Sequence, residues 1–218
     1  STYGGYPEVV TCTEIEEKKE LLKELHTSLL KKDIYESAIQ NEAKFFILVK
    51  ILASQVGEMV NANEIAGTLQ LSRDTVQHYL FVLEKSFVIK LVRPFHRNLR
   101  KELTKMPKVY FLDPGYRNSI LKNFQGFNDR MDMGGYLENI FLTEMCRCPI
   151  EDIKFWRTQD KNEVDFVVNE QIAFEAKVTL QSFKKSKYRM FCKTHPEISL
   201  HPITLHDPNS LELLDFAS

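Results

Sequence analysis

Cysteine, glycine and long apolar runs are all scarce in this sequence, and each shortage excludes a class of protein. Its 218 residues contain only four cysteines, and no two of them form a CxxC pair. A disulfide-stapled miniprotein is therefore excluded, and free thiols in a reducing compartment are expected. Eight glycines and eight prolines exclude a collagen-like chain. No run approaches the roughly 20 apolar residues that span a bilayer, so we expect no membrane contact.

The N-terminal segment also lacks two features. Ser1–Gly5 has no charged and apolar targeting pattern, which favours a cytoplasmic location. It has no initiator methionine either, so we expect a fragment or a naturally short remnant. Cys192, His195, His201 and His206 are the residues that could be lined up as a zinc set, but their spacing matches no common site.

Net charge is nearly absent, but the charges are unevenly placed. The chain has 29 basic and 30 acidic residues, and its 43% hydrophobic content is enough for a real core and excludes a disordered acidic chain. Residues 85–108 carry eight basic residues against one acid, and residues 184–193 carry five against none. A solvated face is the simplest interpretation of such runs, but a nucleic-acid partner is not excluded.

Apolar periodicity predicts two helices in the first part of the chain, over 13–40 and 42–55. Two shorter helices follow, separated by a brief break. Asn61 or Asn63 can cap the first of them, and Ser72 can cap the second.

Two β-rich runs come next, over 87–92 and 108–112, and the turn-forming residues 113–115 end the second run. Three helices followed by a two-stranded hairpin predict a winged helix-turn-helix. The basic loop 93–107 would form its wing.

The second helix of the pair would present Arg73, Gln77 and His78 on its outer side. Arginine and glutamine suit base edges, and the wing cations suit phosphates. Asp74 lies awkwardly for such a surface, and a winged helix used only for protein contacts is the alternative. The residues predicted to contact nucleic acid are Arg73, Gln77, His78, Arg93, Arg97, Arg100, Lys101 and Lys105.

The sequence changes character after residue 130. A helix is predicted over 136–147, and Glu138 lies at the border of its apolar stripe. A carboxylate there needs a partner, for which we expect a cation. Three strands are predicted after it, over 152–157, 163–168 and 172–178.

Three residues separate the last two strands, so a hairpin would place Asp165 across from Glu175 and Glu163 across from Lys177. Opposite residues have Cβ atoms roughly 4.5–5.5 Å apart. Two carboxylates that close repel unless a proton or a hard divalent cation lies between them. Such a site, with Lys177 and Glu138 nearby, would suit metal-assisted hydrolysis of a phosphodiester. An exposed sheet face with a Glu163–Lys177 ion pair is the alternative.

Glu138, Asp165 and Glu175-Ala176-Lys177 resemble the PD-(D/E)xK, or restriction-endonuclease-like, superfamily. The resemblance implies that Asp165, Glu175 and the carbonyl of Ala176 bind Mg²⁺ or Mn²⁺. It also implies that Lys177 positions water or stabilises charge, and that Glu138 completes the catalytic set.

A longer ordered pattern consists of Gly4-Gly5-Tyr6-Pro7-Glu8-Val9-Val10, the winged helix, Arg97-Asn98-Leu99-Arg100-Lys101, Lys108-Val109-Tyr110-Phe111-Leu112-Asp113, Leu137-Glu138-Asn139 and Glu163-Val164-Asp165-Phe166. This pattern resembles the C-terminal half of a family of bacterial and archaeal AAA+ ATPases. The resemblance implies a P-loop domain, a winged helix and a nuclease-like domain in that order. The chain has no G-x-x-x-x-G-K-[ST] motif, so ATP would bind only through a missing domain.

The fold class expected is α+β, with N-terminal helices and a winged helix-turn-helix followed by a small restriction-endonuclease-like domain with a mixed sheet. The domains expected are a lid and linker remnant (1–40), the winged helix (41–116) and the nuclease-like domain (117–218). The function expected is DNA docking and Mg²⁺-dependent phosphodiester hydrolysis. The alternative is a non-catalytic DNA- or protein-binding module with a degenerate nuclease fold. A dimerisation or ATPase-coupling region is a third hypothesis, and a homo-oligomer is left open.

Overall fold

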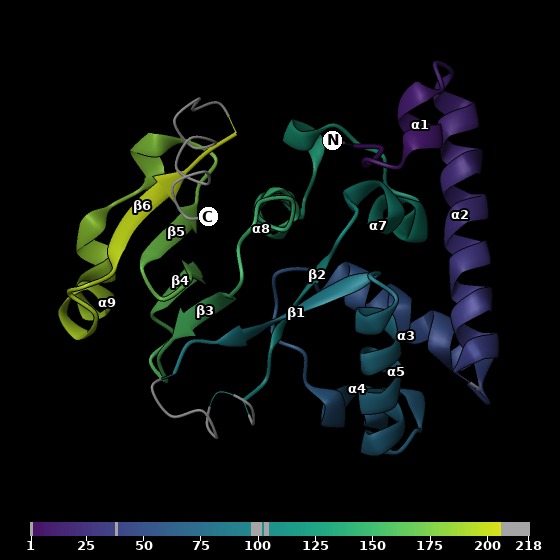
Figure 1. Ribbon diagram of the computed structural model, residues 1–218, viewed down its shortest axis with the longest axis horizontal. Coiled ribbons are helices and arrows are strands. Elements are labelled where there is room, and N and C mark those ends of the chain that lie inside the picture. Colours follow the sequence, from purple (N-terminus) through teal and green to yellow (C-terminus); the bar gives the residue numbers. More distant parts are fainter. Residues whose placement is uncertain (1, 38, 97–101, 103–104, 206–218) are drawn as a thin grey trace. The chain divides into compact units, whose positions relative to one another are not determined.

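The computed structural model describes residues 2–37, 39–96, 102 and 105–205 (Figure 1). In these residues, helices and a mixed sheet form an α+β fold. The predicted α+β class is therefore confirmed. The chain folds into two compact units, in which unit 1 comprises Ser1–Leu91 and Val109–Asn139, and unit 2 comprises Val92–Lys108 and Ile140–Ser218. The predicted domain limits stay predictions, because compactness does not test which segment folds alone.

Unit 1 is mainly helical. α2 and α3 both pack against α7, and α4 packs against α5. α8 begins in unit 1 and continues into unit 2. The helices are α1 (Pro7–Thr11), α2 (Ile15–Glu36), α3 (Glu42–Ser54), α4 (Ala62–Leu69), α5 (Arg73–Lys85), α7 (Pro114–Leu121) and α8 (Met133–Met145).

Local side-chain chemistry sets the ends of α4 and α5. The Asn61 side chain accepts hydrogen bonds from the first-turn amides of α4, and the Ser72 hydroxyl accepts one from the Thr75 amide at 3.0 Å. Gln70 adopts a left-handed conformation between the two helices. The predicted break and the predicted caps are confirmed, because polar side chains at these positions satisfy amides that lack helical partners.

The core of unit 1 lies between these helices and the neighbouring strand segments. Phe45 on α3 makes an edge-to-face contact with Tyr79 on α5, with ring centroids 5.1 Å apart. Val109 and Phe111 reach the same cluster from β2, and both are fully buried. The apolar stripes of α3 and α5 are thus buried, which leaves their polar faces outside.

The segment predicted as a turn after β2 opens a helix. Asp113 caps α7 by accepting a hydrogen bond from the Tyr116 amide at 2.7 Å, and Pro114 occupies the first helical position. Asp-Pro suits a helix start as well as a turn, because proline has no amide hydrogen to leave unpaired there.

Asp113 also contacts the N-terminal glycine motif within unit 1. The Gly5 amide donates a hydrogen bond to Oδ2 of Asp113 at 2.7 Å. Gly4 has a φ of +75°, and a Cβ atom there would lie 2.0 Å from Oδ1 of Asp113. The Gly4-Gly5 segment and Asp113, which both belong to the pattern that resembles the AAA+ family, therefore form one local structure. This structure requires glycine at residue 4.

Among the described residues, six strands form one mixed sheet in the order β2-β1-β3-β4-β5-β6. β1 pairs in parallel with β3, β4 pairs antiparallel with β3 and β5, and β6 pairs in parallel with β5. The strands are β1 (Ile89–Pro94), β2 (Lys108–Phe111), β3 (Ile153–Arg157), β4 (Glu163–Val168), β5 (Ile172–Ala176) and β6 (Ser199–Ile203).

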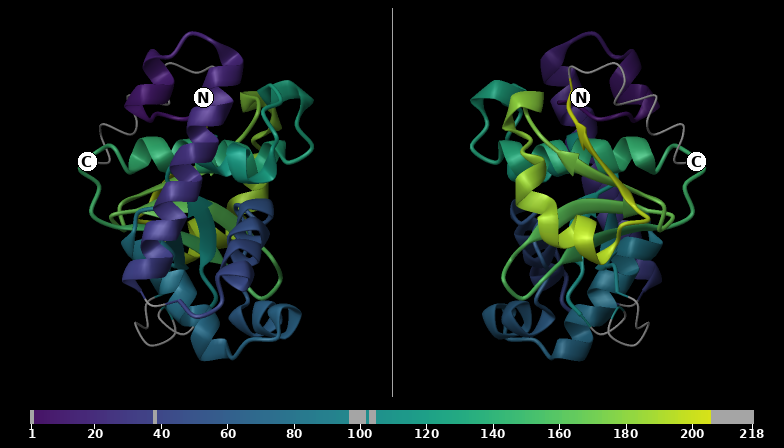
Figure 2. Two further views of the ribbon diagram at one scale, coloured as in Figure 1. Left: turned by 90° about the vertical axis from the view of Figure 1, so that its right-hand side faces the viewer. Right: turned by 90° about the vertical axis from the view of Figure 1, so that its left-hand side faces the viewer.

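A short helix covers one face of the sheet in unit 2. This helix, α9 (Arg189–Thr194), lies in front of the strands in the right-hand view of Figure 2. Its Phe191 is fully buried and packs edge-to-face on Trp156, with ring centroids 5.3 Å apart. Val167 and Ala173 join the same cluster. Since side chains alternate along a strand, Asp165 and Glu175 share this covered face with Val167 and Ala173.

Candidate functional site

A pair of buried carboxylates lies on β4 and β5 in unit 2. Phe166 stands opposite Phe174, which is the predicted register and makes Asp165 and Glu175 neighbours. The two acidic residues are 7% and 6% exposed. Oδ2 of Asp165 accepts a hydrogen bond from the Ala176 amide at 2.9 Å, and Oε2 of Glu175 lies 3.4 Å from the Asp165 amide. The alternative of an exposed sheet face is therefore wrong for these two residues.

Lys177 lies against the same group. Its Nζ atom is 2.5 Å from Oε1 of Glu175 and 3.2 Å from the carbonyl oxygen of Ala176. Lys177 therefore pairs with Glu175 and not, as the alternative required, with Glu163. The structure brings together Asp165, Glu175, Ala176 and Lys177, the four residues that the sequence placed on the two strands.

Glu163 is held by two other cations. Nη1 of Arg157 is 2.6 Å from Oε2 of Glu163, and Nζ of Lys108 is 2.6 Å from Oε1. Glu163 therefore has a basic partner at each of its two carboxylate oxygens.

Lys108 is the residue that sequence reasoning missed. Its side chain is 2% exposed, and its ammonium lies 3.9 Å from Oδ1 of Asp165 as well as beside Glu163. The ammonium is also 5.6 Å from the centroid of the Phe155 ring. A buried lysine is nearly always paired. A lysine opening an apolar strand was the only signal, and its acidic partners lie far away in the sequence.

Acidic and basic side chains balance in this cluster. Three carboxylates meet three cations, so the group has no net formal charge and each member has an oppositely charged neighbour. We call this the β4–β5 charge cluster, and its members are Lys108, Arg157, Glu163, Asp165, Glu175 and Lys177.

Tyr188 borders the charge cluster. Burial raises the pKa of its hydroxyl, and the negative charge of Glu175 and a hydrogen bond to it raise that pKa further, as does Asp165. The hydroxyl therefore keeps its proton and can donate it to a carboxylate. Tyr188 is a buried residue within the basic run 184–193, whose lysine and arginine side chains are exposed, so that run passes the cluster at Tyr188.

Glu138 lies on α8 in unit 1, whereas the charge cluster lies in unit 2. Its predicted part in one catalytic set with that cluster therefore stays a prediction. Its Oε2 atom accepts a hydrogen bond from the Tyr110 hydroxyl at 2.7 Å. The next residue, Asn139, is fully buried and exchanges two hydrogen bonds with the backbone of Phe111, at 2.7 and 2.8 Å. The Glu138-Asn139 pair thus holds two consecutive residues of β2 to α8.

The predicted nucleic-acid contacts have mixed environments. Arg73, Gln77 and His78 are exposed on α5, as is Asp74. Lys105 is exposed, and Arg93 on β1 is half-buried. Arg97, Arg100 and Lys101 lie outside the described residues.

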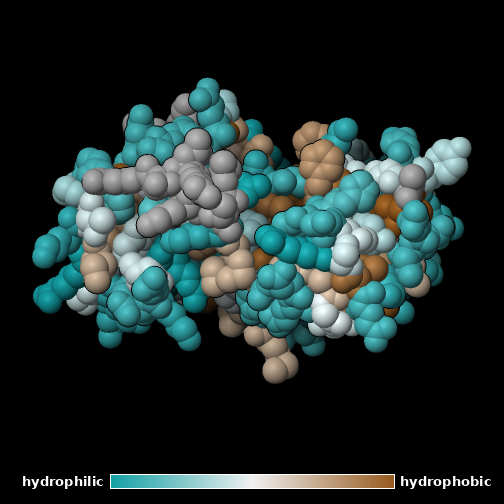
Figure 3. Space-filling view, turned by 90° about the horizontal axis from the view of Figure 1, so that it is seen from below, coloured by the Kyte–Doolittle hydropathy of each residue, from teal (hydrophilic) through white to brown (hydrophobic). Residues whose placement is uncertain are grey.

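The cysteine and histidine residues near the C-terminus were the other metal ligands that the sequence offered. Across the residues that the structure describes, no group of three or more histidine, cysteine, aspartate or glutamate side chains is arranged to hold a metal ion. Cys192, His195 and His201 therefore form no such group, and His206 lies outside the described residues. Hydrophilic side chains cover much of the face in Figure 3. None of the described helices combines the length and apolarity needed to cross a membrane.

Fold and charge cluster together define an α+β protein whose sheet carries buried carboxylates, each in contact with a basic side chain. The chain belongs to the family described as "Domain of unknown function (DUF8612)", which matches residues 2–126. No solved structure gives a significant match.

Several curated proteins are similar over most of this chain. The uncharacterized protein Rv2008c of Mycobacterium tuberculosis is 25% identical over 173 residues, which cover 76% of this chain and 38% of that protein. An uncharacterized protein of Haemophilus influenzae is 27% identical over 189 residues, covering 79% and 44%. Uncharacterized protein MJ1544 of Methanocaldococcus jannaschii is 25% identical over 174 residues, covering 76% and 37%. The chain thus spans less than half the length of these relatives.

Proposed function

We propose that this chain is the DNA-directed module of an AAA+ ATPase, and that the β4–β5 charge cluster is a Mg²⁺-dependent, nuclease-like site for phosphodiester hydrolysis. The observation that carries the proposal is the adjacency of two buried carboxylates, Asp165 and Glu175, with the Lys177 ammonium bound to Glu175 and to the carbonyl of Ala176. This is the residue set and spacing of the PD-(D/E)xK pattern.

The donor chemistry of the site fits a hard divalent cation. Carboxylate and carbonyl oxygens are the ligands that Mg²⁺ prefers, and Asp165, Glu175 and Ala176 would supply them. The Lys177 ammonium already contacts the Glu175 carboxylate and the Ala176 carbonyl, so these oxygens stabilise a positive charge. The metal would supply an activated water and charge neutralisation. Lys177 would then hold a phosphate oxygen or orient water, and Tyr188 would donate a hydrogen bond to Glu175.

The surfaces of both units support a DNA partner. Along the chain, α3, α4 and α5 are followed by β1 and β2, which is the element order of a winged helix, and α5 in unit 1 exposes Arg73 and Gln77. In unit 2, the basic run 184–193 passes the charge cluster at Tyr188, and its lysines at 184, 185 and 187 are exposed. Such cations would bind phosphates independently of base sequence.

ATP binding and assembly would belong to the whole protein. The chain has no P-loop motif, and the relatives extend well beyond the matched segment. We propose that a P-loop domain occupies part of the remaining length and that any homo-oligomer forms through it.

A specific observation favours a second candidate, a non-catalytic DNA- or protein-binding module with a degenerate nuclease fold. Lys108 neutralises Glu163 and approaches Asp165, and it is almost fully buried. Together with Arg157 and Lys177, it balances the carboxylates without any metal. In this candidate the cluster only stabilises the sheet.

Calorimetric titration of Mn²⁺ into the full chain separates the two candidates. The nuclease-like site predicts a single-site isotherm that Asp165→Asn abolishes and Asp160→Asn leaves intact, because Asp160 lies on an exposed turn of the same unit. Circular dichroism would show that both variants are folded. Cleavage of DNA by the parent in Mn²⁺, and not by Asp165→Asn, would extend the result to catalysis. Absence of heat in the parent would favour the second candidate.

A further inference from the structure

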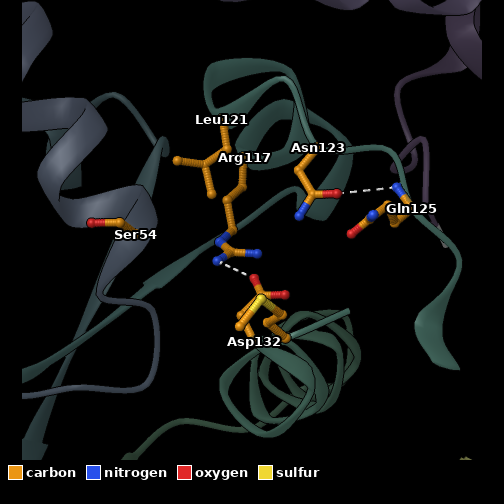
Figure 4. Close-up of a pocket in the computed structure, with 7 residues that line it drawn as sticks. Ser54, Arg117, Leu121, Asn123, Gln125 and Asp132 are labelled. Carbon is orange, nitrogen blue, oxygen red and sulfur yellow. Dashed lines mark hydrogen bonds and ion pairs between the residues drawn. The ribbon is translucent and has the colours of Figure 1, made fainter. Parts of the chain in front are cut away.

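A separate cavity of about 270 Å³ lies within unit 1 (Figure 4). Its walls come from the end of α3, from α7 and from the segment that leads into α8. Ser54, Leu121 and Met131 form part of the wall, and the charged groups are Arg117 and Asp132. All of these residues belong to unit 1, so the cavity is independent of the charge cluster on β4 and β5.

Arg117 is an unusual residue to find in a cavity wall, because it is only 1% exposed. Its Nε atom donates to the carbonyl of Ala53 at 2.8 Å, and its Nη2 atom donates to Oδ2 of Asp132 at 2.6 Å. Its Nη1 atom is buried and has no hydrogen-bond partner among the described residues. A buried guanidinium donor without an acceptor is costly, which points to an acceptor that enters from the cavity.

Positive charge exceeds negative charge at this place. Nε and Nη2 of Arg130 bind the two oxygens of Asp132 at 2.9 and 3.0 Å, so two guanidinium groups share one carboxylate. Burial raises the pKa of Asp132, but hydrogen bonds from Arg130 and Arg117 outweigh it and keep that pKa below its usual value. Burial lowers the pKa of Arg117, yet an arginine side chain stays protonated in proteins. The three groups therefore carry one net positive charge.

Asn123 adds a second donor whose orientation is fixed. Its Oδ1 atom accepts a hydrogen bond from the Gln125 amide at 3.2 Å, so the side-chain nitrogen is left to donate. Figure 4 shows that nitrogen on the side of Asn123 that faces Arg117. Leu121 supplies apolar wall beside these donors, and the fully exposed Met131 also lines the cavity.

We propose that this cavity binds a small oxyanion, such as the phosphate or carboxylate group of a metabolite. Nη1 of Arg117 and the side-chain amide of Asn123 would hold the anionic oxygens, and Leu121 and Met131 would contact an apolar body. A charge-assisted hydrogen bond from arginine would supply most of the affinity, since the guanidinium is already buried and held by Ala53 and Asp132.

Titration of the ¹⁵N-labelled full chain followed by NMR tests this site. Inorganic phosphate and acetate are the two probes, added at constant ionic strength against a chloride blank. The proposal predicts a saturable shift of the Asn123 side-chain amide resonances. Saturation by phosphate, acetate or both supports the oxyanion site and distinguishes phosphate from carboxylate ligands. Shifts that stay linear, or that chloride reproduces, would overturn it.

Two matched variants locate the effect. Asn123→Asp puts a negative charge at the proposed donor and should weaken binding at least about tenfold, a change of roughly 1.4 kcal/mol. Asn128→Asp makes the same change at an exposed position of the same segment, and should stay within about twofold of the parent. Arg117→Lys, checked for folding by its amide spectrum, should also lose binding because it lacks the Nη1 donor. Equal weakening by both aspartate variants would contradict the assignment.

Discussion

The ammonium of Lys108 lies 2.6 Å from Oε1 of Glu163, although the two residues are far apart in the sequence and the lysine side chain is only 2% exposed. Its other neighbours are Asp165, at 3.9 Å, and the Phe155 ring. A buried cation in that place is stabilised by these acids, and the acids in turn are stabilised by the cation. The pairing thus connects the first residue of β2 to the strand that carries the candidate site.

We predict that Lys108→Met destabilises the protein by about 2–4 kcal/mol, because it leaves Glu163 and Asp165 with one cation fewer in a buried place. Arg157 remains beside Glu163 and keeps the loss from being larger. Urea unfolding measures the change.

The matched control for that variant is Lys32→Met on α2. Lys32 and Glu36 form an exposed pair at 3.8 Å, so the control should cost no more than about 0.5 kcal/mol. If both methionine variants lost the same stability, Lys108 would not hold the cluster together.

Glycine at residue 4 should be required, whereas glycine at residue 67 should not. Gly4→Ala would place a methyl group 2.0 Å from Oδ1 of Asp113 at a φ of +75°, so we expect a loss of about 1–3 kcal/mol. Gly67 lies on α4 with no atom within 4 Å of an added Cβ, so Gly67→Ala should stabilise by about 0.5–1 kcal/mol. Thermal unfolding should show shifts of opposite sign, and shifts of the same sign would contradict the contact with Asp113.

His26 should make stability fall in mild acid. Burial lowers the pKa of its imidazole from the ordinary 6.5, and a backbone hydrogen bond only partly opposes this. The ring also lies 3.0 Å from the Ser119 hydroxyl. Because the folded pKa is the lower one, the unfolded chain takes up the proton first. Stability from this group is complete above pH 6.5 and is lost as the pH falls toward the folded pKa.

Urea unfolding at several pH values measures this dependence. We expect His26→Gln to flatten the slope just below neutrality, because glutamine does not titrate. His78→Gln is the control, since His78 is exposed on α5. An unchanged slope in His26→Gln would assign the acid sensitivity to other groups.

Local signals made much of the fold predictable. The three-residue link and the alternation on β4 and β5 left one register that buries an apolar face, so the pairing of Asp165 with Glu175 followed from the sequence. Caps at Asn61 and Ser72 were equally local. By contrast, α9 and β6 are short, and their periodicity is too brief to distinguish from a loop.

Long-range contacts account for what the sequence did not reveal. Lys108 pairs with residues of another strand, and Arg117 is held by groups from two other segments of unit 1, at Ala53 and Asp132. Neither lysine nor arginine is expected to be buried from its type alone. The Glu163–Lys177 ion pair, which belonged to the alternative of an exposed sheet face, does not form for a related reason. Lys108 and Arg157 both reach Glu163, and Lys177 is left to bind the nearer Glu175.

DNA binding through α5 makes a last prediction that depends on the proposed function. Arg73→Gln should weaken binding of duplex DNA and reduce the slope of log K against log salt by about 1, if Arg73 contacts a phosphate. Lys31→Gln removes the same charge from an exposed position of α2 and should leave that slope unchanged. Fluorescence anisotropy with a labelled duplex, at several salt concentrations, measures both. An equal effect of the two variants would mean that only net charge matters and that α5 is not the docking helix. A loss confined to one duplex sequence would instead assign Arg73 to a base edge, where a bidentate contact contributes about 1–3 kcal/mol of discrimination.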